Sequence, residues 1–236
     1  MRMHEYDYND QYWVNLFNLM YEKGIKRHHV SLEYDSFKRY CQVLKTFYSK
    51  YPKKNISHIV KLAEPNFDYH IFDIKNIEEK IIFYKKMLMT NKIDTIQWMW
   101  RGDLKNDNIR INDYISQKSK IQKYIELAKN NKDFENFYFF PYTLDFARIC
   151  ILENCVDGII VYRNPKETLY DDLIQECNSL NKKCITIRPF ESGKAFKRGF
   201  NSRDLYSFAF NLNSIDGIIT SISRMDYFSE DNLFSV

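Results

Sequence analysis

Short apolar runs alternate with amphipathic segments along the whole chain. The pattern is clearest in residues 156–224, where runs beginning at Val156, Cys184 and Ile215 are rich in Ile and Val and are separated by segments with helical spacing. Buried parallel strands are near-continuous apolar runs because both of their faces are covered. The repeat of about 30 residues is typical of a strand–helix–strand unit. This part of the chain is therefore predicted to supply three parallel strands.

The same pattern predicts five more strands, and the helices between them, in the first two thirds of the chain. The predicted strands are residues 3–8, 25–31, 55–62, 93–100 and 134–142. The predicted helices are residues 12–23, 35–50, 76–90, 117–131 and 144–153, with another at 203–212. Gly24 is expected to cap the first helix in a left-handed conformation, and Thr143 to cap the fifth at its N-terminus. Residues 101–116, rich in Asn, Asp and Ile, are predicted to form an extended surface loop.

Eight strand positions with seven intervening helices predict a compact (β/α)8 TIM barrel that forms a single domain over residues 1–236. A doubly wound open sheet is the alternative. It is less favoured because none of the 6 glycines are spaced as GxGxxG after the first strand, as a dinucleotide-binding turn requires. The chain also lacks a nucleophile elbow, an HExxH motif and a P-loop.

The composition narrows the function classes. The net charge is +4 and the basic residues form only short clusters, so we expect no nucleic-acid partner. The 5 cysteines lack CxxC spacing, which favours buried thiols in a reducing compartment and no metal site. We expect no signal peptide and no membrane span, because the N-terminus has no apolar core and no apolar run reaches about 18 residues. A cytoplasmic location follows as an expectation.

In a barrel of this kind, the chemistry takes place at the C-terminal ends of the strands. The residues at those ends include Tyr34, Lys61, Met99, Asn164, Ser192, Gly193, Ser221, Ser223 and Arg224. With these residues the chain resembles the aldo-keto reductases over nearly its whole length. The likeness is strongest where VYRNP, RPFESGK and GIITSISRMDYFSEDN resemble that family's last three strand ends and its terminal cofactor-binding segment. Earlier, GIKRHHVSLEY resembles the strand that normally reads DTAxxY, HIVKL one ending in TK, and IDTIQWMW one ending in a catalytic His.

The resemblance implies an NADP-dependent oxidoreductase acting on a small carbonyl or sugar-type substrate. In that family a Tyr donates a proton to the carbonyl oxygen while NADPH delivers hydride, a Lys lowers the pKa of the Tyr, an Asp pairs with the Lys and a His orients the substrate. A phenol with a pKa of about 10 needs such a cation to act near neutral pH. Tyr34 matches the proton donor and Lys61 the cation. His29 stands at the Asp position and is the third candidate catalytic residue.

Two of these four positions therefore depart from the family pattern. Lys61 lacks its usual carboxylate. Without the catalytic His, substrate orientation must come from elsewhere, and Asp35, Glu64 and Arg101 are the candidate substitutes. Met99 stands where the catalytic His is normal and is expected to fill its space. Trp98 and Trp100 would then face away from the barrel interior.

The resemblance also assigns cofactor contacts. Asn164 would hold the nicotinamide. The phosphates would lie against Ser192, Gly193, Lys194, Ser221, Ser223 and Arg224, and the adenine against Glu230 and Asn232. Arg188 is a further candidate for the anion site, and Arg163 is expected to be a surface charge.

Three function classes remain open from the sequence. The first is the NADP-dependent reductase, expected to be a monomer as many members of that family are. The second is a catalytically silent barrel of the same fold that binds a nucleotide or a protein partner. The third is a lyase or isomerase that uses Lys61 as a Schiff-base amine.

Overall fold

The computed structural model describes residues 3, 7–62, 72–100 and 106–228. The helices are α1 (Asp10–Glu22), α2 (Phe37–Lys50), α3 (Ile74–Met87), α4 (Asp107–Asn130), α5 (Leu144–Ile151), α6 (Asp171–Ser179) and α7 (Ser202–Phe210). The strands are β1 (Arg27–Val30), β2 (Ser57–Leu62), β3 (Ile93–Trp98), β4 (Phe134–Phe139), β5 (Gly158–Tyr162), β6 (Lys183–Ile187) and β7 (Ile215–Ile219). Short 3-10 turns are η2 (Glu191–Gly193), η3 (Phe196–Arg198) and η4 (Met225–Phe228).

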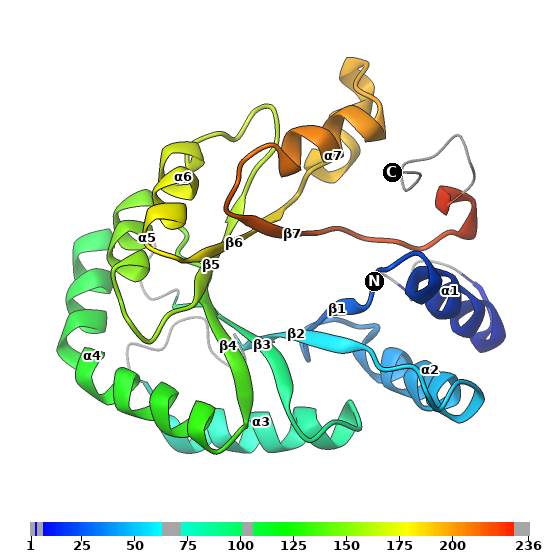
Figure 1. The fold of residues 1–236 in the computed structure, drawn as a ribbon, viewed down its shortest axis with the longest axis horizontal. Helices are drawn as coiled ribbons and strands as arrows, with labels where there is room; N and C mark the ends of the chain where they lie inside the picture. The colour runs from blue at the N-terminus through cyan, green and yellow to red at the C-terminus, as the bar shows by residue number, and fades with distance from the viewer. Residues whose placement is uncertain (1–2, 4–6, 63–71, 101–105, 229–236) are drawn as a thin grey trace.

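The strands form one parallel sheet in chain order, from β1 to β7. Helices surround the curved sheet on its outside (Figure 1). This nearly closed arrangement confirms the predicted (β/α)8-like barrel. Seven of the eight predicted strands lie in the described residues. The predicted strand at 3–8 falls partly outside them, and its described residues form no strand.

A side chain bridges the two edges of the sheet. No hydrogen-bonded ladder joins β1 to β7 within the described ranges. Arg27 on β1 donates through Nη2 to the carboxylate of Asp216 at 2.8 Å and to its backbone carbonyl at 3.3 Å. A Cβ on Gly217 would lie only 2.9 Å from the same nitrogen. Glycine on β7 thus leaves room for the guanidinium that ties the seam.

Apolar side chains fill both sides of the sheet. The larger cluster lies between the strands and the helices and includes Trp98 and Trp100, so the expectation that they face away from the interior is confirmed. The smaller cluster fills the barrel interior: Ile59, Tyr138, Phe140, Ile160 and Ile185, with Met99 packed against it. The interior is therefore a packed core, as in other barrels of this kind.

Helix α4 begins at Asp107, so the predicted loop over residues 101–116 is wrong for its described second half. In this first part of α4 the buried residues are Arg110 and Tyr114, which are one helical turn apart, whereas Ile109 and Ile115 are 46% and 53% exposed. Arg110 donates to the carbonyl oxygens of Trp100 and Pro141 and is paired with Asp107. A buried arginine and exposed isoleucines invert the hydrophobic pattern that would have indicated a helix.

Other local expectations fare better. Gly24 has φ +83° after α1, and the Thr143 side chain accepts from the Phe146 backbone N–H at the start of α5. All 5 cysteines are free and buried. Arg163 is not the surface charge expected, because it is fully buried and bonded to Asp171. Across the described residues, no helix has the length and apolar character needed to cross a membrane.

Candidate active site

The turn between β1 and α2 carries two side chains to the mouth of the barrel. The Tyr34 N–H donates to the Ser31 carbonyl at 3.1 Å, and the Glu33 N–H donates to the Ser31 hydroxyl at 3.2 Å. The Leu32 N–H donates to the hydroxyl of Tyr84 on α3 at 2.7 Å. The turn is thereby held to both itself and the neighbouring helix. Glu33 and Tyr34 consequently have defined positions next to the ends of β1 and β2.

Lys61 on β2 forms an ion pair with Glu33. The two side chains are only 13% and 11% exposed, and a buried ammonium needs such a counter-charge. Lys61 Nζ also lies 5.8 Å from the ring centre of Tyr34. The second carboxylate oxygen of Glu33 is buried and accepts no hydrogen bond from the described part of the chain. Lys61 is thus a fixed cation beside the candidate proton donor.

His29 on β1 completes the cluster together with Gln97 on β3. Its Nδ1 lies 3.3 Å from the Tyr34 hydroxyl, and its Nε2 lies 2.7 Å from Gln97 Oε1. Burial lowers the pKa of His29 to about 4, the Gln97 hydrogen bond opposes this shift, and the charge of Lys61 adds to it. His29 is therefore neutral at pH 7, because burial makes the charged imidazolium costly.

The three candidate catalytic residues, Tyr34, Lys61 and His29, are thus brought together at one end of the barrel (the strands that carry them are adjacent in Figure 1). Glu33 and Gln97 were not among the predicted site residues. Glu33 directly precedes the candidate tyrosine, but its contact with Lys61 depends on the shape of the turn. Gln97 pairs in register with Lys61, which strand alternation alone could have indicated.

Of the three suggested substitutes, one lies among the described residues. Asp35 is exposed, one residue beyond Tyr34. Glu64 and Arg101 lie outside the described residues. Met99 is partly buried against the interior cluster.

The loop after β5 contains Asn164, which is fully buried. Its amide nitrogen donates to the Glu167 carboxylate and, at 3.3 Å, to the Arg188 carbonyl. Its amide oxygen accepts from the Lys166 N–H at 3.0 Å. Asn164 thereby links the ends of β5 and β6. Its predicted contact with a nicotinamide would have to share these bonds.

The loop after β6 contains the predicted phosphate contacts Ser192, Gly193 and Lys194. Ser192 and Gly193 have φ +58° and +88°, and a Cβ on Gly193 would meet nothing within 4 Å. Hydrogen bonds from Arg198 lower the pKa of Glu191, and the charges of Lys166 and Lys194 act in the same direction. Three cations therefore surround one carboxylate, which leaves surplus positive charge beside an open, tightly turned backbone.

The segment after β7 contains the remaining predicted contacts. Ser221 is exposed and Ser223 is buried. Arg224 Nε donates to Asp226 at 3.0 Å, so the anion predicted for this arginine would compete with a carboxylate. Tyr12 on α1 accepts from the Met225 N–H at 3.2 Å, which anchors η4 against the start of the chain. Glu230 and Asn232 lie outside the described residues.

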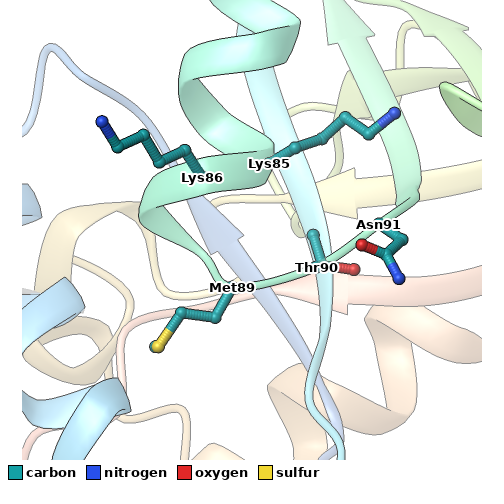
Figure 2. A pocket seen from close by; sticks show the side chains of 5 residues that line it. All are labelled: Lys85, Lys86, Met89, Thr90 and Asn91. Atoms are coloured by element: carbon teal, nitrogen blue, oxygen red, sulfur yellow. The ribbon is translucent and has the colours of Figure 1, made fainter.

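A shallow pocket of about 400 Å³ lies elsewhere, where α3 leads into β3. Figure 2 shows its lining: Lys85, Lys86, Met89, Thr90 and Asn91. The lysines point to opposite sides, and Lys85 pairs with Asp133 at 2.8 Å. This pocket is at the N-terminal ends of the strands, away from the candidate active site. In the described ranges, no group of three or more His, Cys, Asp or Glu residues is arranged to hold a metal ion.

Compared by sequence, the chain matches no family model and no curated protein. Compared by structure, it is similar to a proposed aldo-keto reductase from Pseudomonas aeruginosa, with a TM-score of 0.68, 15% identity and 92% of this chain covering 79% of the other. It is also similar to the holo form of an aldo-keto reductase from Bacillus halodurans, with a TM-score of 0.68, 12% identity and 93% of this chain covering 79% of the other. For an aldo/keto reductase from Klebsiella pneumoniae in complex with NADP and acetate, the TM-score is 0.66 and the identity 11%, and 93% of this chain covers 78% of the other. The chain has the aldo-keto reductase fold, as the sequence resemblance implied.

Proposed function

We propose that this protein is an NADP-dependent oxidoreductase that reduces a small carbonyl or sugar-type substrate, with Tyr34 as the proton donor. The observation that carries the proposal is the cluster at the barrel mouth, where Lys61 is fixed by Glu33 beside the ring of Tyr34. A nearby cation favours the phenolate, which makes a tyrosine a better acid at neutral pH. A filled barrel interior leaves this mouth as the place for a reacting group.

The other half of the mouth supports the cofactor. The turned backbone at Ser192 and Gly193, with Lys166 and Lys194 close by, is a donor set suited to phosphate. The segment after the last strand is also a general phosphate site in this kind of barrel. When bound, NADP(H) would supply the hydride chemistry. Tyr34 would hold the substrate oxygen and give it a proton, and Lys61 would stabilise the phenolate that remains.

One Glu33 oxygen has no hydrogen-bond partner among the described residues, which supports a hydroxyl-bearing substrate. It is buried next to Lys61 and can accept a hydrogen bond. A substrate hydroxyl beside the carbonyl would satisfy it, whereas a plain alkyl aldehyde would not. Hydroxyaldehydes and sugars should therefore be reduced with higher kcat/KM than alkyl aldehydes of equal size.

The Schiff-base alternative is disfavoured by the Glu33 ion pair, because an ammonium held by a carboxylate is not a nucleophile until it loses its proton. The silent barrel remains the alternative outcome of the test. A monomer in the cytoplasm is part of the proposal, and the 5 buried free thiols are consistent with a reducing compartment.

Fluorescence titration with NADPH followed by a carbonyl reductase assay tests the proposal. We expect saturable binding, reduction of a hydroxyaldehyde, and loss of reduction by roughly 100-fold in Tyr34→Phe with binding retained. Tyr51→Phe, a tyrosine at the far end of α2, is the matched control and should keep full activity. No binding at millimolar NADPH would refute the proposal and leave a partner-binding barrel.

A further inference from the structure

His29 lies between Gln97 and Tyr34, with one ring nitrogen toward each. Nε2 is 2.7 Å from Gln97 Oε1, and Nδ1 is 3.3 Å from the Tyr34 hydroxyl. A carbonyl oxygen can only accept a hydrogen bond, so the ring proton of the neutral imidazole is on Nε2. Nδ1 then presents its lone pair to the tyrosine. The imidazole is oriented as a proton acceptor for Tyr34.

Gln97 holds that orientation in either protonation state of the ring. When Nδ1 gains a proton, Nε2 keeps its own and still donates to the same oxygen. Gln97 is 3% exposed, and its backbone lies opposite Lys61 in the β2–β3 ladder, so the amide is packed away from solvent beside His29. The ring therefore needs no flip when a proton arrives or leaves.

We propose that His29, oriented by Gln97, is a positioning residue that exchanges the reaction's proton with Tyr34. This inference rests on the proposed function. In carbonyl reduction the Tyr34 O–H bond breaks, and its proton goes to the substrate oxygen as the substrate carbon receives hydride. Solvent protonates the neutral imidazole at Nδ1, and the phenolate then takes that proton from the imidazolium. In alcohol oxidation the Tyr34 proton moves to Nδ1, and the phenolate accepts the alcohol proton while the alcohol carbon gives its hydride to an oxidised nicotinamide.

The charges around the ring suit this exchange. Glu33 pairs with Lys61, and an imidazolium and a phenolate that form together leave the net charge of the cluster unchanged. Opposite charges about 3 Å apart in a partly buried site attract strongly, which offsets the unfavourable protonation of a buried imidazole. The 3.3 Å separation is long for a hydrogen bond, and such bonds tighten when substrate binds.

The test combines kinetics with a measurement that needs no turnover. Nitrogen NMR of the wild-type protein, with histidine labelled, should place the His29 proton on Nε2 at pH 7, and Gln97→Met should give a mixture of tautomers. His29→Ala should lower kcat by roughly 100-fold with little change in NADPH binding, and it should alter the pH profile of kcat. Added imidazole should restore part of that kcat. His29→Asn fills the space without a ring, and imidazole should not rescue it.

The outcomes separate the two proposals. A wild-type enzyme that binds no NADPH and reduces no carbonyl refutes the proposed function and this exchange with it. An active wild-type enzyme whose His29→Ala variant keeps its kcat and pH profile, or whose His29 carries its proton on Nδ1, refutes the exchange alone. Where His29→Ala does not fold, His29→Asn and the wild-type spectrum decide.

Discussion

Two buried histidines behind the active site should make the fold sensitive to mild acid. His28 and His58 lie under α2, where the Tyr40 hydroxyl is 3.0 Å from His28 Nδ1 and 2.9 Å from His58 Nε2. Burial lowers the pKa of His58 to about 3 and that of His28 well below its usual value, with the charge of His58 adding to the second shift. The chain satisfies both contacts only when the hydroxyl donates to one ring and accepts from the other. With their pKa values lowered in this way, both histidines stay neutral while the protein is folded.

The sign follows from proton uptake on unfolding. In the unfolded chain each histidine has a pKa of about 6.5 and binds a proton below that pH, whereas in the folded protein it stays neutral. The free energy of unfolding therefore falls as the pH drops below about 6.5. Each pH unit of such a difference is worth about 1.4 kcal/mol per proton. At pH 5 His58 thus costs about 2 kcal/mol relative to neutral pH, and His28 adds a loss of the same sign. That is a large part of a typical stability of about 5–15 kcal/mol.

Urea unfolding at pH 5, 6, 7 and 8 measures the effect. In His58→Gln the amide can still bond to the Tyr40 hydroxyl but cannot titrate. The loss of stability between pH 7 and pH 5 should shrink by about 2 kcal/mol in this variant, whatever the substitution costs at pH 8. His29 and the carboxylates are the same in both proteins and cancel in the comparison. An equal pH dependence in wild type and variant would refute the reasoning.

Two further predictions concern the barrel frame. Gly158→Ala places a Cβ 2.2 Å from the Lys183 carbonyl on the neighbouring strand and should lower the free energy of unfolding by about 3 kcal/mol. Gly199→Ala, at φ +86° in open space, is the control and should lower it by about 1 kcal/mol, both measured by urea unfolding. Arg27→Met removes the hydrogen bonds across the β1–β7 seam and should lower the free energy of unfolding by about 1.5 kcal/mol. Lys92→Met, at an exposed ion pair, is the control and should lower it by about 0.5 kcal/mol or less. Equal losses would show that the seam needs no side-chain bridge.

The frame of this protein is predictable from its sequence because buried parallel strands are distinctive. The runs at β5, β6 and β7 are Ile- and Val-rich on both faces, so their type, order and spacing follow from the pattern alone. The start of α4 did not follow, because there the pattern is inverted. Arg110 is buried through hydrogen bonds to backbone carbonyls that come from distant segments, and no local periodicity encodes them.

Of the candidate site, the proximity of Tyr34, Lys61 and His29 could be predicted from the resemblance and from spacing against strand ends, which a sheet register preserves. Glu33 could not, because its side chain reaches Lys61 through a turn whose shape depends on Ser31 and on a hydroxyl from α3. A long-range hydrogen bond decides the direction of that carboxylate, and residue spacing contains no trace of it.

The position of Glu33 changes what the departures from the family pattern mean. The resemblance places a carboxylate on the first of the three site strands, where this chain has His29. In the structure a carboxylate still reaches Lys61, from the turn that follows the strand. The ammonium thus keeps its counter-charge, and the strand position is released for a neutral imidazole that contacts Tyr34 instead. Under the proposed function, different residues supply the electrostatics that a tyrosine acid needs, which favours a rearranged site over a lost one.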